Sequence, residues 1–443
     1  MKDPIKLLLV NPSQIEVYGK ITAPSYLPLG LAYLGAFTRN LGHEVKIFDI
    51  DAEKKKEFAK IVKEFSPDFI GFTATTPTFN NAISLINKAR EISHAKIILG
   101  GIHATIMPEE CEKHADHVVI GEGELALQQI LEGKAGKFVK MPFIENLDEL
   151  PFPIRDFSGK YTYPDALFKE CFPIITSRGC IGQCTFCCTK QMYGTKFRYR
   201  SAKNIVDEIE YLIKTYKARE IHIWDDCFTL IKNRVFEIRD EIKNRNIQLL
   251  FAFPNGVRVD YFDEEIASAL KDMGTYSVAF GIDSGNQKLL DFAKKNVTLE
   301  QSRQAVRIAK KFGFETWGFF MMGLPFETKA TIKNTVKFAK ELELDIAKFH
   351  ILKPFPKSEV YEWLNSRGLI FDRNYAHYGL HTKPVHELPD LTPKELIYLN
   401  KKAYREFYMR PKEILKQVFR LRSWNRIKVN VKAGFSIIKK SFA

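Results

Sequence analysis

Four of the seven cysteines in this 443-residue chain crowd into one short run, CIGQCTFCC, which begins at Cys180. Cys180, Cys184 and Cys187 have the spacing C-x3-C-x2-C. The run follows a short apolar segment, so we expect a loop that can wrap three thiolates around one face of an iron–sulfur cubane. Complete protein ligation of a [4Fe–4S] cluster takes four cysteines. Three would leave one iron open to an outside chelator.

Other uses of these cysteines stay open on sequence grounds. Zinc sites are commonly built from two pairs of ligands, and no second pair follows at the spacing of a zinc ribbon. Cys188 offers an alternative register, C-x3-C-x3-C, and the thiols could simply be buried. Cys111, Cys171 and Cys227 stand alone, and we interpret each as a core or surface thiol.

The element that must position this loop is the first strand of a repeating strand–helix series. Six apolar runs alternate with amphipathic helical stretches in residues 171–370. The series predicts a partial (β/α)6 barrel, whose chemistry would lie at the carboxyl ends of the strands. The predicted strands are Pro173–Gly179, Glu220–Asp226, Leu249–Asn255, Tyr276–Ile282, Thr316–Gly323 and Ala347–Phe355.

Residues 1–140 show a second strand–helix alternation, which predicts an α/β domain with a doubly wound, Rossmann-like parallel sheet. Ligands of such sheets bind beyond the carboxyl ends of the strands. No GxGxxG follows the first strand and no GxxxxGK[ST] occurs, which argues against a nicotinamide nucleotide or a P-loop. The predicted strands are Lys6–Asn11, Glu44–Ile50, Asp68–Ala74, Lys96–Gly101 and His117–Gly123.

The remaining segments are a linker and a tail. Residues 141–170 hold four prolines and little periodicity, so we predict a linker between the two domains. Residues 371–443 are predicted to be helical and basic. The net charge is +14, and residues 401–443 carry 13 basic and 2 acidic side chains, so the excess belongs to the tail. Since no run approaches about 18 apolar residues and no signal peptide is recognisable, we expect a soluble cytoplasmic protein.

The tail has the pattern of a cationic amphipathic helix. Within Lys412–Val429, Ile414, Val418 and Leu421 recur at helical spacing among lysines and arginines. Such a helix could lie on an anionic membrane, which would make the protein peripheral at the inner face of the membrane. Alternatively, it could pack on the barrel with its basic face in water. No nucleic-acid-binding module accompanies the charge, so we expect no nucleic-acid partner.

The cysteine run resembles the signature of the radical S-adenosylmethionine (SAM) superfamily. Ser177–Cys187 (SRGCIGQCTFC) is similar to its C-x3-C-x-aromatic-C motif, with Phe186 in the aromatic position. The resemblance implies that Cys180, Cys184 and Cys187 hold a [4Fe–4S] cluster, with the amino and carboxylate groups of SAM on the open iron. It also implies a flavodoxin- or ferredoxin-like electron donor and cleavage of SAM to a 5′-deoxyadenosyl radical. Phe186 would lie against the adenine.

Other barrel segments resemble strand-end sequences of cobalamin-linked members of the superfamily. The resemblance implies that Asp283 and Ser284 contact the ribose or carboxylate of SAM, although the family more often has Glu at position 283. The resembling segments are Ile223–Thr229, Gly281–Gln287, Met321–Thr328 and Lys353–Tyr361.

Two charged sites near these segments have competing interpretations. Arg258 could pair with the SAM carboxylate, or with Asp260 or Asp263 at the surface. The pair Asp225–Asp226 could belong to the site or could cap the next helix.

The N-terminal domain resembles the cobalamin-binding domain of the same proteins, and with the barrel the resemblance covers about residues 5–370. It implies a cobalamin whose nucleotide tail passes small residues, because absence of side-chain bulk permits close backbone approach. The cobalamin-region candidates are Thr73, Thr75, Thr76, Gly100, Gly101 and His103. The D-x-H-x-x-G motif that supplies a lower histidine ligand is absent, so His103 is favoured as a packing histidine and the lower face would be unligated or water-bound. A domain that kept the fold and lost the cofactor is the alternative.

The resemblance as a whole implies a class B radical SAM methyltransferase that acts on an unactivated carbon of a small-molecule or lipid substrate. In such enzymes cobalamin carries a methyl group from one SAM to a carbon from which the radical made from a second SAM has removed hydrogen. Relatives that close rings or rearrange carbon skeletons share both modules, and a non-catalytic iron–sulfur or cobalamin sensor is a further alternative. Methylthiotransferase activity is disfavoured, because residues 1–140 hold one cysteine, Cys111, too few for an auxiliary cluster.

Overall fold

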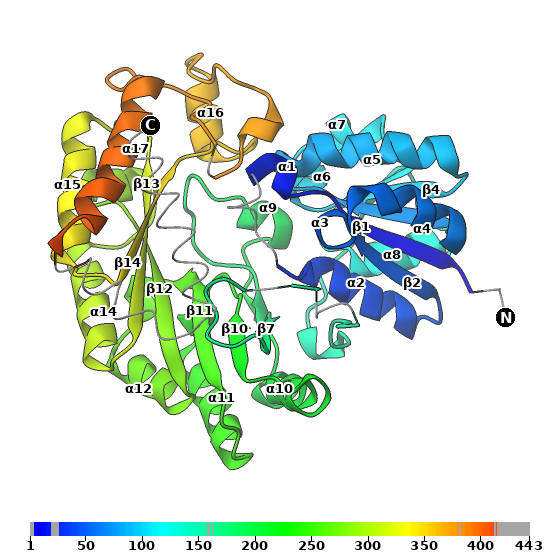
Figure 1. Cartoon of the computed structure of the whole chain (residues 1–443), viewed down its shortest axis with the longest axis horizontal. Coiled ribbons are helices and arrows are strands. Elements are labelled where there is room, and N and C mark those ends of the chain that lie inside the picture. Colours follow the sequence, from blue (N-terminus) through cyan, green and yellow to red (C-terminus); the bar gives the residue numbers. More distant parts are fainter. Residues whose placement is uncertain are drawn as a thin grey trace.

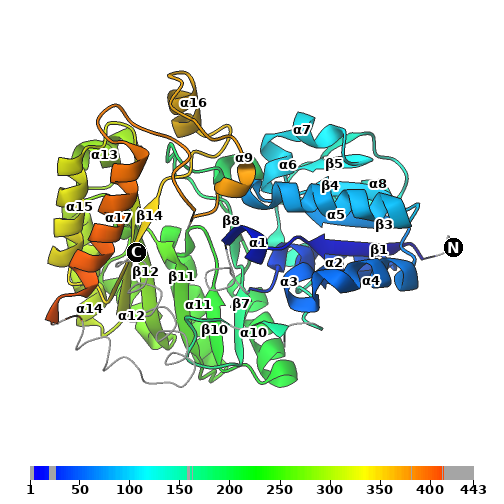
Figure 2. The ribbon, with the colours of Figure 1, turned by 45° about the horizontal axis from the view of Figure 1, so that its top comes forward.

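The computed structural model describes residues 4–18, 26–156, 160–161, 163–380, 382–411 and 413. Two parallel sheets, each flanked by helices, lie side by side (Figure 1, Figure 2). The predicted α/β fold class is confirmed, with a parallel-sheet N-terminal domain, a parallel-sheet barrel domain and a helix near the C-terminal end of the described chain.

The N-terminal sheet has six parallel strands in the order β2-β1-β3-β4-β5-β6. They are β1 (Lys6–Asn11), β2 (Glu44–Asp49), β3 (Phe69–Thr73), β4 (Lys96–Gly100), β5 (His117–Ile120) and β6 (Phe138–Lys140). The last of them is absent from the sequence prediction, because it has three residues of which only Val139 is buried. A pattern that short gives no periodicity to read.

Helices cover both faces of this sheet, as the doubly wound prediction requires. They are α1 (Ile15–Tyr18), α2 (Leu29–Asn40), α3 (Ile50–Glu53), α4 (Phe58–Phe65), α5 (Phe79–Ile92), α6 (Ile102–Ile106), α7 (Pro108–Glu112) and α8 (Glu124–Leu131). One core cluster joins the strands to α4 and α5 through Phe58, Phe65 and Phe79. A separate cluster joins the other face to α2 and α8 through Leu31 and Leu127.

The second sheet is also parallel, in the order β14-β13-β12-β11-β10-β7. Its strands are β7 (Cys171–Ile174), β10 (Glu220–Ile223), β11 (Leu250–Val257), β12 (Thr275–Asp283), β13 (Glu315–Met322) and β14 (Ile346–Ile351). Among the described residues β7 and β14 each pair with one barrel neighbour, so the six-stranded barrel is open on one side.

Helices pack on the outer face of the barrel. The large ones follow the strands in turn and bury their apolar sides against alternate strand residues such as Phe251, Phe280 and Phe320. The helices of this domain are α10 (Ala202–Tyr216), α11 (Lys232–Asn244), α12 (Glu264–Asp272), α13 (Gln287–Phe292), α14 (Leu299–Lys311), α15 (Lys329–Glu341), α16 (Glu359–Asn365) and α17 (Pro393–Tyr408). Of these, α16 lies at the end of the barrel and not on its outer face (Figure 1).

The predicted strand Pro173–Gly179 is wrong as one element. The chain forms β7, leaves the barrel at Ile175, and then forms the short strand β8 (Ser177–Arg178), which pairs antiparallel with β9 (Arg198–Tyr199). The break has a local cause, because the Thr176 amide and the Ser177 hydroxyl both donate to the buried carboxylate of Asp225 at 2.6 and 2.5 Å.

The proline-rich segment 141–170 is packed against both domains. Leu147 and Leu150 are buried against the N-terminal domain, whereas Tyr163 is buried at the inner side of the barrel. Arg155 is buried and pairs with Glu208 of α10 at 3.0 Å. We call residues 141–170 the strap.

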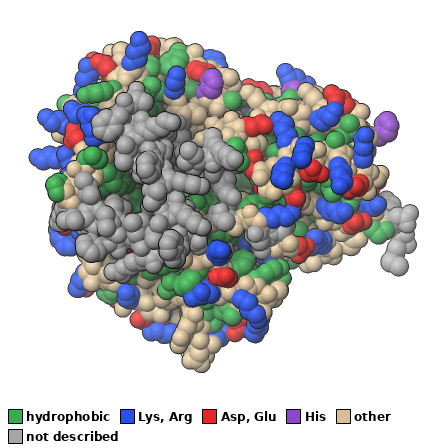
Figure 3. Space-filling model, in the orientation of Figure 1, with side chains coloured by type: hydrophobic (Ala, Val, Ile, Leu, Met, Phe, Trp, Pro, Cys, Tyr) green, Lys and Arg blue, Asp and Glu red, His purple; other side chains and the backbone are tan. Residues whose placement is uncertain are grey.

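The C-terminal region becomes helical later than the sequence suggests. Isolated bridges pair Ile370 with His386 and Leu388 with Leu391, and α17 begins only after its N-cap Thr392, which forms a capping box with Glu395. The predicted amphipathic segment Lys412–Val429 lies outside the described residues except for Glu413. Of the helices in the described ranges, none combines the length and apolarity that a membrane crossing needs. On the face shown in Figure 3, basic and acidic side chains are interspersed over the N-terminal domain.

A buried cluster of four charges joins the two domains, and we call it the junction. Glu122 lies in the turn after β5 and Glu124 is the first residue of α8, whereas Arg178 and Arg198 come from β8 and β9. Arg198 pairs with Glu122 at 2.7 Å, and Arg178 pairs with Glu122 at 3.1 Å and Glu124 at 2.6 Å. All four side chains are less than a tenth exposed. Because two charges of each sign meet, the junction is neutral as a whole.

Replacing Arg198 by methionine is expected to lower the free energy of unfolding by about 3 kcal/mol, because Glu122 stays buried and loses its closest cation. Urea unfolding followed by circular dichroism measures this. The matched control, Lys203→Met, removes an exposed pair with Asp207 and should cost less than about 1 kcal/mol. Equal unfolding curves for the two variants would contradict a structural role for the junction.

Candidate cofactor site

The cysteine run forms a loop between β8 and the short helix α9 (Thr189–Tyr193). A Cβ atom at Gly182 would lie 3.3 Å from Cys180 Sγ and 3.9 Å from Cys184 Sγ, so these two sulfurs converge on the same point. The Thr189 amide donates to Cys187 Sγ at 3.4 Å. The three thiols are partly exposed and free, which fits ligation of a cluster at one open face of the loop.

Backbone hydrogen bonds hold the loop against the far side of the barrel. The Thr185 amide donates to the carbonyl of Ala293, at the end of α13, and the Val360 amide of α16 donates to the carbonyl of Thr185, both at 3.0 Å. Phe186 lies partly buried against the barrel core. The loop therefore crosses the carboxyl ends of the strands, where the barrel prediction placed the chemistry.

Two cations lie beside the cysteines. Arg258 approaches the Gly182 position within 3.2 Å and pairs with Asp260 at 2.8 Å. The sequence left open whether Arg258 pairs with the SAM carboxylate or with an aspartate at the surface. The structure shows the pair with Asp260, but the pair is not at the surface, since both side chains are less than 15% exposed. Lys295 is buried and pairs with Asp283 at 2.7 Å. Positive charge near cysteine sulfurs favours their thiolate form.

Cys227 is a neighbour of this loop that the sequence does not reveal, because 47 positions separate it from Cys180 in the chain. A hydrogen bond between their thiols lowers the pKa of Cys180 to about 6 and raises that of Cys227. The prediction that Cys111, Cys171 and Cys227 are core or surface thiols agrees with their burial. Cys188 points to the carbonyl of Pro356 at 4.0 Å, and burial raises its pKa to about 12, which favours the register with Cys187.

The acidic residues at the strand ends have different surroundings. Asp225 accepts hydrogen bonds from Thr176 and Ser177 rather than capping a helix, so the capping interpretation is wrong for this residue. Burial raises the pKa of Asp226 to about 6. Asp283 has a left-handed backbone (φ 64°) and faces Lys295 beside the cysteine loop. Ser284 instead lies 3.3 Å from the Thr335 hydroxyl of α15.

A cavity of about 130 Å³ opens at the carboxyl edge of the N-terminal sheet and runs between the sheet and helices α2 and α8. Its walls are mostly apolar, and the glycines are Gly30, Gly71, Gly100, Gly101 and Gly123. A Cβ at Gly71 would lie 2.9 Å from Leu9 Cδ2, and one at Gly100 would lie 3.5 Å from Val119 Cβ, so side chains there would take up the space. The shape therefore fits the tail of a large cofactor inserted between strands and helices.

The barrel domain closes the mouth of this cavity. Arg178 of the junction and Met192 and Tyr193 of α9 all line it. The Thr105 hydroxyl donates to Met192 Sδ at 3.6 Å and accepts a hydrogen bond from the Gly121 amide at 3.0 Å. One short segment thus carries the cysteines at one end and the cavity wall at the other.

The predicted cobalamin-region residues fall into two groups. Thr73, Gly100 and Gly101 line the cavity. Thr75 forms a capping box with Thr78, and Thr76 lies 3.2 Å from His103 Nδ1.

His103 is fully buried on the opposite side of the sheet end. The centre of its ring lies 4.0 Å from that of Phe79 of α5, with the two planes tilted by 36°, and 4.9 Å from that of Tyr375. Burial lowers the pKa of His103 to about 4, so the ring is neutral. These contacts support the interpretation of His103 as a packing histidine.

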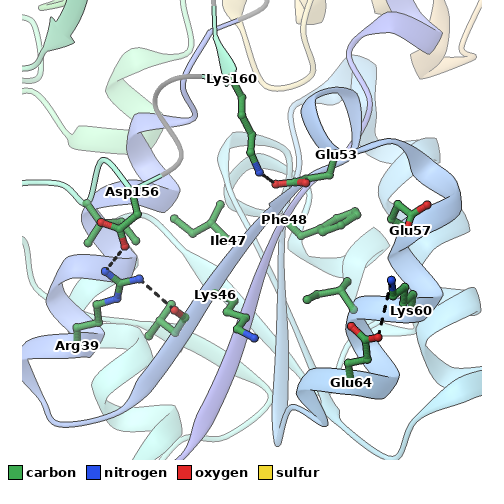
Figure 4. Close-up of a pocket in the computed structure, with 13 residues that line it drawn as sticks. Arg39, Lys46, Ile47, Phe48, Glu53, Glu57, Lys60, Glu64, Asp156 and Lys160 are labelled. Atoms are coloured by element: carbon green, nitrogen blue, oxygen red, sulfur yellow. Dashed lines mark hydrogen bonds and ion pairs between the residues drawn. The ribbon is translucent and has the colours of Figure 1, made fainter. Parts of the chain in front are cut away.

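A larger groove, of about 410 Å³, lies along the edge strand β2 (Figure 4). Charged pairs line it, among them Arg39 with Asp156 at 2.6 Å and Lys160 with Glu53. It contains none of the predicted site residues and lies on the far edge of the sheet from β5. We therefore assign it no part in the cofactor site.

A further set of possible metal ligands, Cys171, Glu220 and His222, lies buried at the inner side of β7 and β10. Glu220 is already fully hydrogen-bonded. One oxygen accepts from the amides of Leu167 and Phe168 in the strap, and the other contacts His222 Nε2 at 2.7 Å. The set ties the strap to the barrel.

Comparison with known proteins identifies both domains. Residues 20–131 match the B12 binding domain family, and residues 174–339 match the Radical SAM superfamily. An uncharacterized methyltransferase of Pyrococcus horikoshii is 34% identical over 94% of this chain and 95% of its own length. The chain belongs to the cobalamin-binding radical SAM proteins. It is accordingly a radical SAM enzyme, and its cofactors are a [4Fe–4S] cluster, SAM and cobalamin.

More distant relatives of this radical SAM enzyme have different reactions. The cytidylyl-2-hydroxyethylphosphonate methyltransferase of Streptomyces wedmorensis is 27% identical over 91% of this chain and 90% of that protein. The anaerobic magnesium-protoporphyrin IX monomethyl ester cyclase of Rubrivivax gelatinosus is 26% identical over 91% and 78%. The solved structure of the cobalamin-dependent SAM radical enzyme OxsB shares the fold, with a TM-score of 0.74, 16% identity, and coverage of 99% of this chain and 72% of that chain.

Substituting Cys180, Cys184 or Cys187 by alanine, one at a time, is expected to lower the iron content and the cluster absorbance of anaerobically reconstituted protein. Each change removes one of three thiolate ligands. The neighbouring variant Cys188→Ala should keep both signals, because its sulfur faces Pro356. If Cys188→Ala lost the cluster and Cys187→Ala retained it, the third ligand would be Cys188 and not Cys187.

Gly100→Val is expected to weaken cobalamin binding by about tenfold or more, a loss of about 1.4 kcal/mol or more, because the new side chain enters the cavity. Its strand position accepts a β-branched residue, so the fold should survive. Equilibrium dialysis against hydroxocobalamin measures the affinity. The control is Gly136→Val, where an added Cβ would meet nothing within 4 Å. Unchanged affinity in Gly100→Val would place the cofactor tail elsewhere.

Proposed function

We propose that this enzyme methylates an unactivated carbon of a small molecule. The observation that carries the proposal is the continuity of the segment from Cys180 to Tyr193, which bears the cysteines and then closes the cobalamin cavity with Met192 and Tyr193. When bound, the cluster with SAM supplies a hydrogen-abstracting radical and cobalamin supplies a transferable methyl group. A methyl donor and a radical source joined by one short helix suit transfer between them.

The chain's own residues would bind and orient these groups. Cys180, Cys184 and Cys187 would hold the cluster, and Phe186 would support the adenine of SAM. Arg258 and Lys295 place positive charge next to the thiolates, and their partners Asp260 and Asp283 keep each cation in position.

On the N-terminal side, Thr73, Gly100 and Gly101 would receive the cobalamin tail along the cavity wall. Gly101 has a left-handed backbone (φ 92°), and a Cβ there would lie 2.7 Å from the carbonyl of Ala74. Only glycine therefore allows β3 and β4 to end so close together at this edge.

Ring closure is the second candidate reaction. It is favoured by the similarity to a magnesium-protoporphyrin IX monomethyl ester cyclase over 91% of this chain. Both reactions begin with removal of a hydrogen atom from carbon, so the same cysteine loop would serve either. They differ in whether the product gains a carbon.

Anaerobic reconstitution with cluster, cobalamin and SAM, followed by mass spectrometry of cell extracts, tests the proposal. A methyltransferase should produce a compound heavier by one CH2 unit, together with 5′-deoxyadenosine and S-adenosylhomocysteine. A product lighter by two hydrogens would indicate ring closure instead. Formation of no 5′-deoxyadenosine by the loaded protein, with an artificial reductant present, would contradict both and favour a sensor. Cys184→Ala is the inactive control.

A further inference from the structure

One wall of the barrel interior is aromatic and carries a cation. Side chains alternate between the two faces of a strand, and the outward set on β13 and β14 includes Phe320 and Phe349, which are buried in the core beneath the helices. Phe349 lies against Tyr404 and Phe407 of α17. The intervening residues therefore face the barrel interior.

The inward set on these strands includes Trp317, Phe319, Lys348 and His350, together with Glu315, Met321 and Ile346. The Trp317 Nε1 donates a hydrogen bond to the Glu315 carboxylate at 2.7 Å. The register places Phe319 opposite Lys348. Lys348 Nζ lies 4.6 Å from the centre of the Trp317 ring and 5.7 Å from that of Phe319. His350 meets Phe319 edge-on at 6.5 Å.

Lys348 differs from the other interior cations of the barrel. Lys295 and Arg258 each have a carboxylate within 3 Å, whereas Lys348 has no ion pair within the described parts of the chain. Its side chain is only partly exposed. A half-buried ammonium gains from an aromatic face, but a carboxylate or phosphoryl oxygen would stabilise it further.

The neighbouring strands present small residues toward this wall. On β12 the residues in register with Trp317 and Phe319 are Ala279 and Gly281. A Cβ at Gly256 of β11 would lie 3.7 Å from the Phe319 ring, so a glycine again stands next to that ring. Among the described residues, these small neighbours leave the Phe319 side chain partly exposed, whereas the Trp317 ring is only 8% exposed and lies against Lys348.

The opposite side of the interior is filled. Tyr163 of the strap packs with Cys171 of β7 and with Leu27 and Leu29. Its ring also lies 6.1 Å from that of Trp224, just after β10. A substrate between the cysteine loop and the barrel floor would therefore meet the wall formed by β13 and β14.

We infer that the substrate has an apolar or aromatic body with an anionic group, and that Lys348 pairs with that group while the partly exposed Phe319 ring packs on the body. This inference rests on the proposed function, because it assumes that the barrel interior receives the molecule to be methylated. Lys348 determines specificity and takes no part in the reaction itself. Carboxylate and phosphoryl groups share the required chemistry.

The test is anaerobic equilibrium dialysis of the cofactor-loaded protein against three matched probes: 4-nitrobenzoate, 4-nitrophenyl phosphate and the neutral 4-nitrobenzamide. At least one anion should bind more tightly than the amide. Lys348→Met should weaken that anion about tenfold or more and leave the amide unchanged, and Lys348→Arg should keep the preference. The control Lys337→Met, an exposed lysine of α15, should match the unaltered protein.

The outcomes separate this inference from the proposed function. Equal binding of the anions and the amide, or an equal loss of all probes in Lys348→Met, overturns the role of Lys348. The relative affinity of the two anions identifies the carboxylate or the phosphoryl group as the preferred one. SAM cleavage is measured on the same samples. Its presence without anion selectivity contradicts only this inference, whereas selectivity without cleavage contradicts only the proposed function.

Discussion

The buried junction of Glu122, Glu124, Arg178 and Arg198 is the constraint on which the relation of the two domains depends. Charges removed from water tolerate little displacement, because separation of one pair leaves an uncompensated ion in a poorly polarisable interior. Arg178 precedes the first cysteine by two positions, and Glu122 follows the end of β5 by two. The junction therefore fixes the start of the cysteine loop against the carboxyl edge of the N-terminal sheet.

The covalent chain from Arg178 to Tyr193 then links the cysteine loop to the cavity of the N-terminal domain. Residues 178–193 contain one of the two cations of the junction, Arg178, the cysteines, and part of the wall of the cavity at the sheet edge. The distance between the two cofactor sites is consequently determined more by this short stretch of chain than by the wider surface between the domains. Backbone hydrogen bonds from Thr185 and Val360 hold the other side of the same loop.

What the sequence predicts well is local or periodic. The cysteine spacing lies within one loop, and the strand–helix alternation repeats through both domains, so the parallel sheets and the family were predictable from the printed residues. The approach of Cys227 to Cys180 and the pairing of Arg198 with Glu122 were not, since each brings together residues that are distant in the chain. Asp225 shows the same limit. A helix cap and a buried acceptor look alike in sequence, and only the fold shows that the carboxylate holds Thr176 and Ser177.

The strap has a consequence for how such a protein can change. Because Tyr163 occupies part of the barrel interior and Arg155 anchors the same segment to α10, the connection between the domains also limits the room inside the barrel. Shortening or enlarging a few side chains there would alter the size of molecule admitted without touching a barrel strand or a cysteine. The size of substrate that related proteins accept can thus change through substitutions in the strap alone, while the barrel strands and the cysteine loop stay the same.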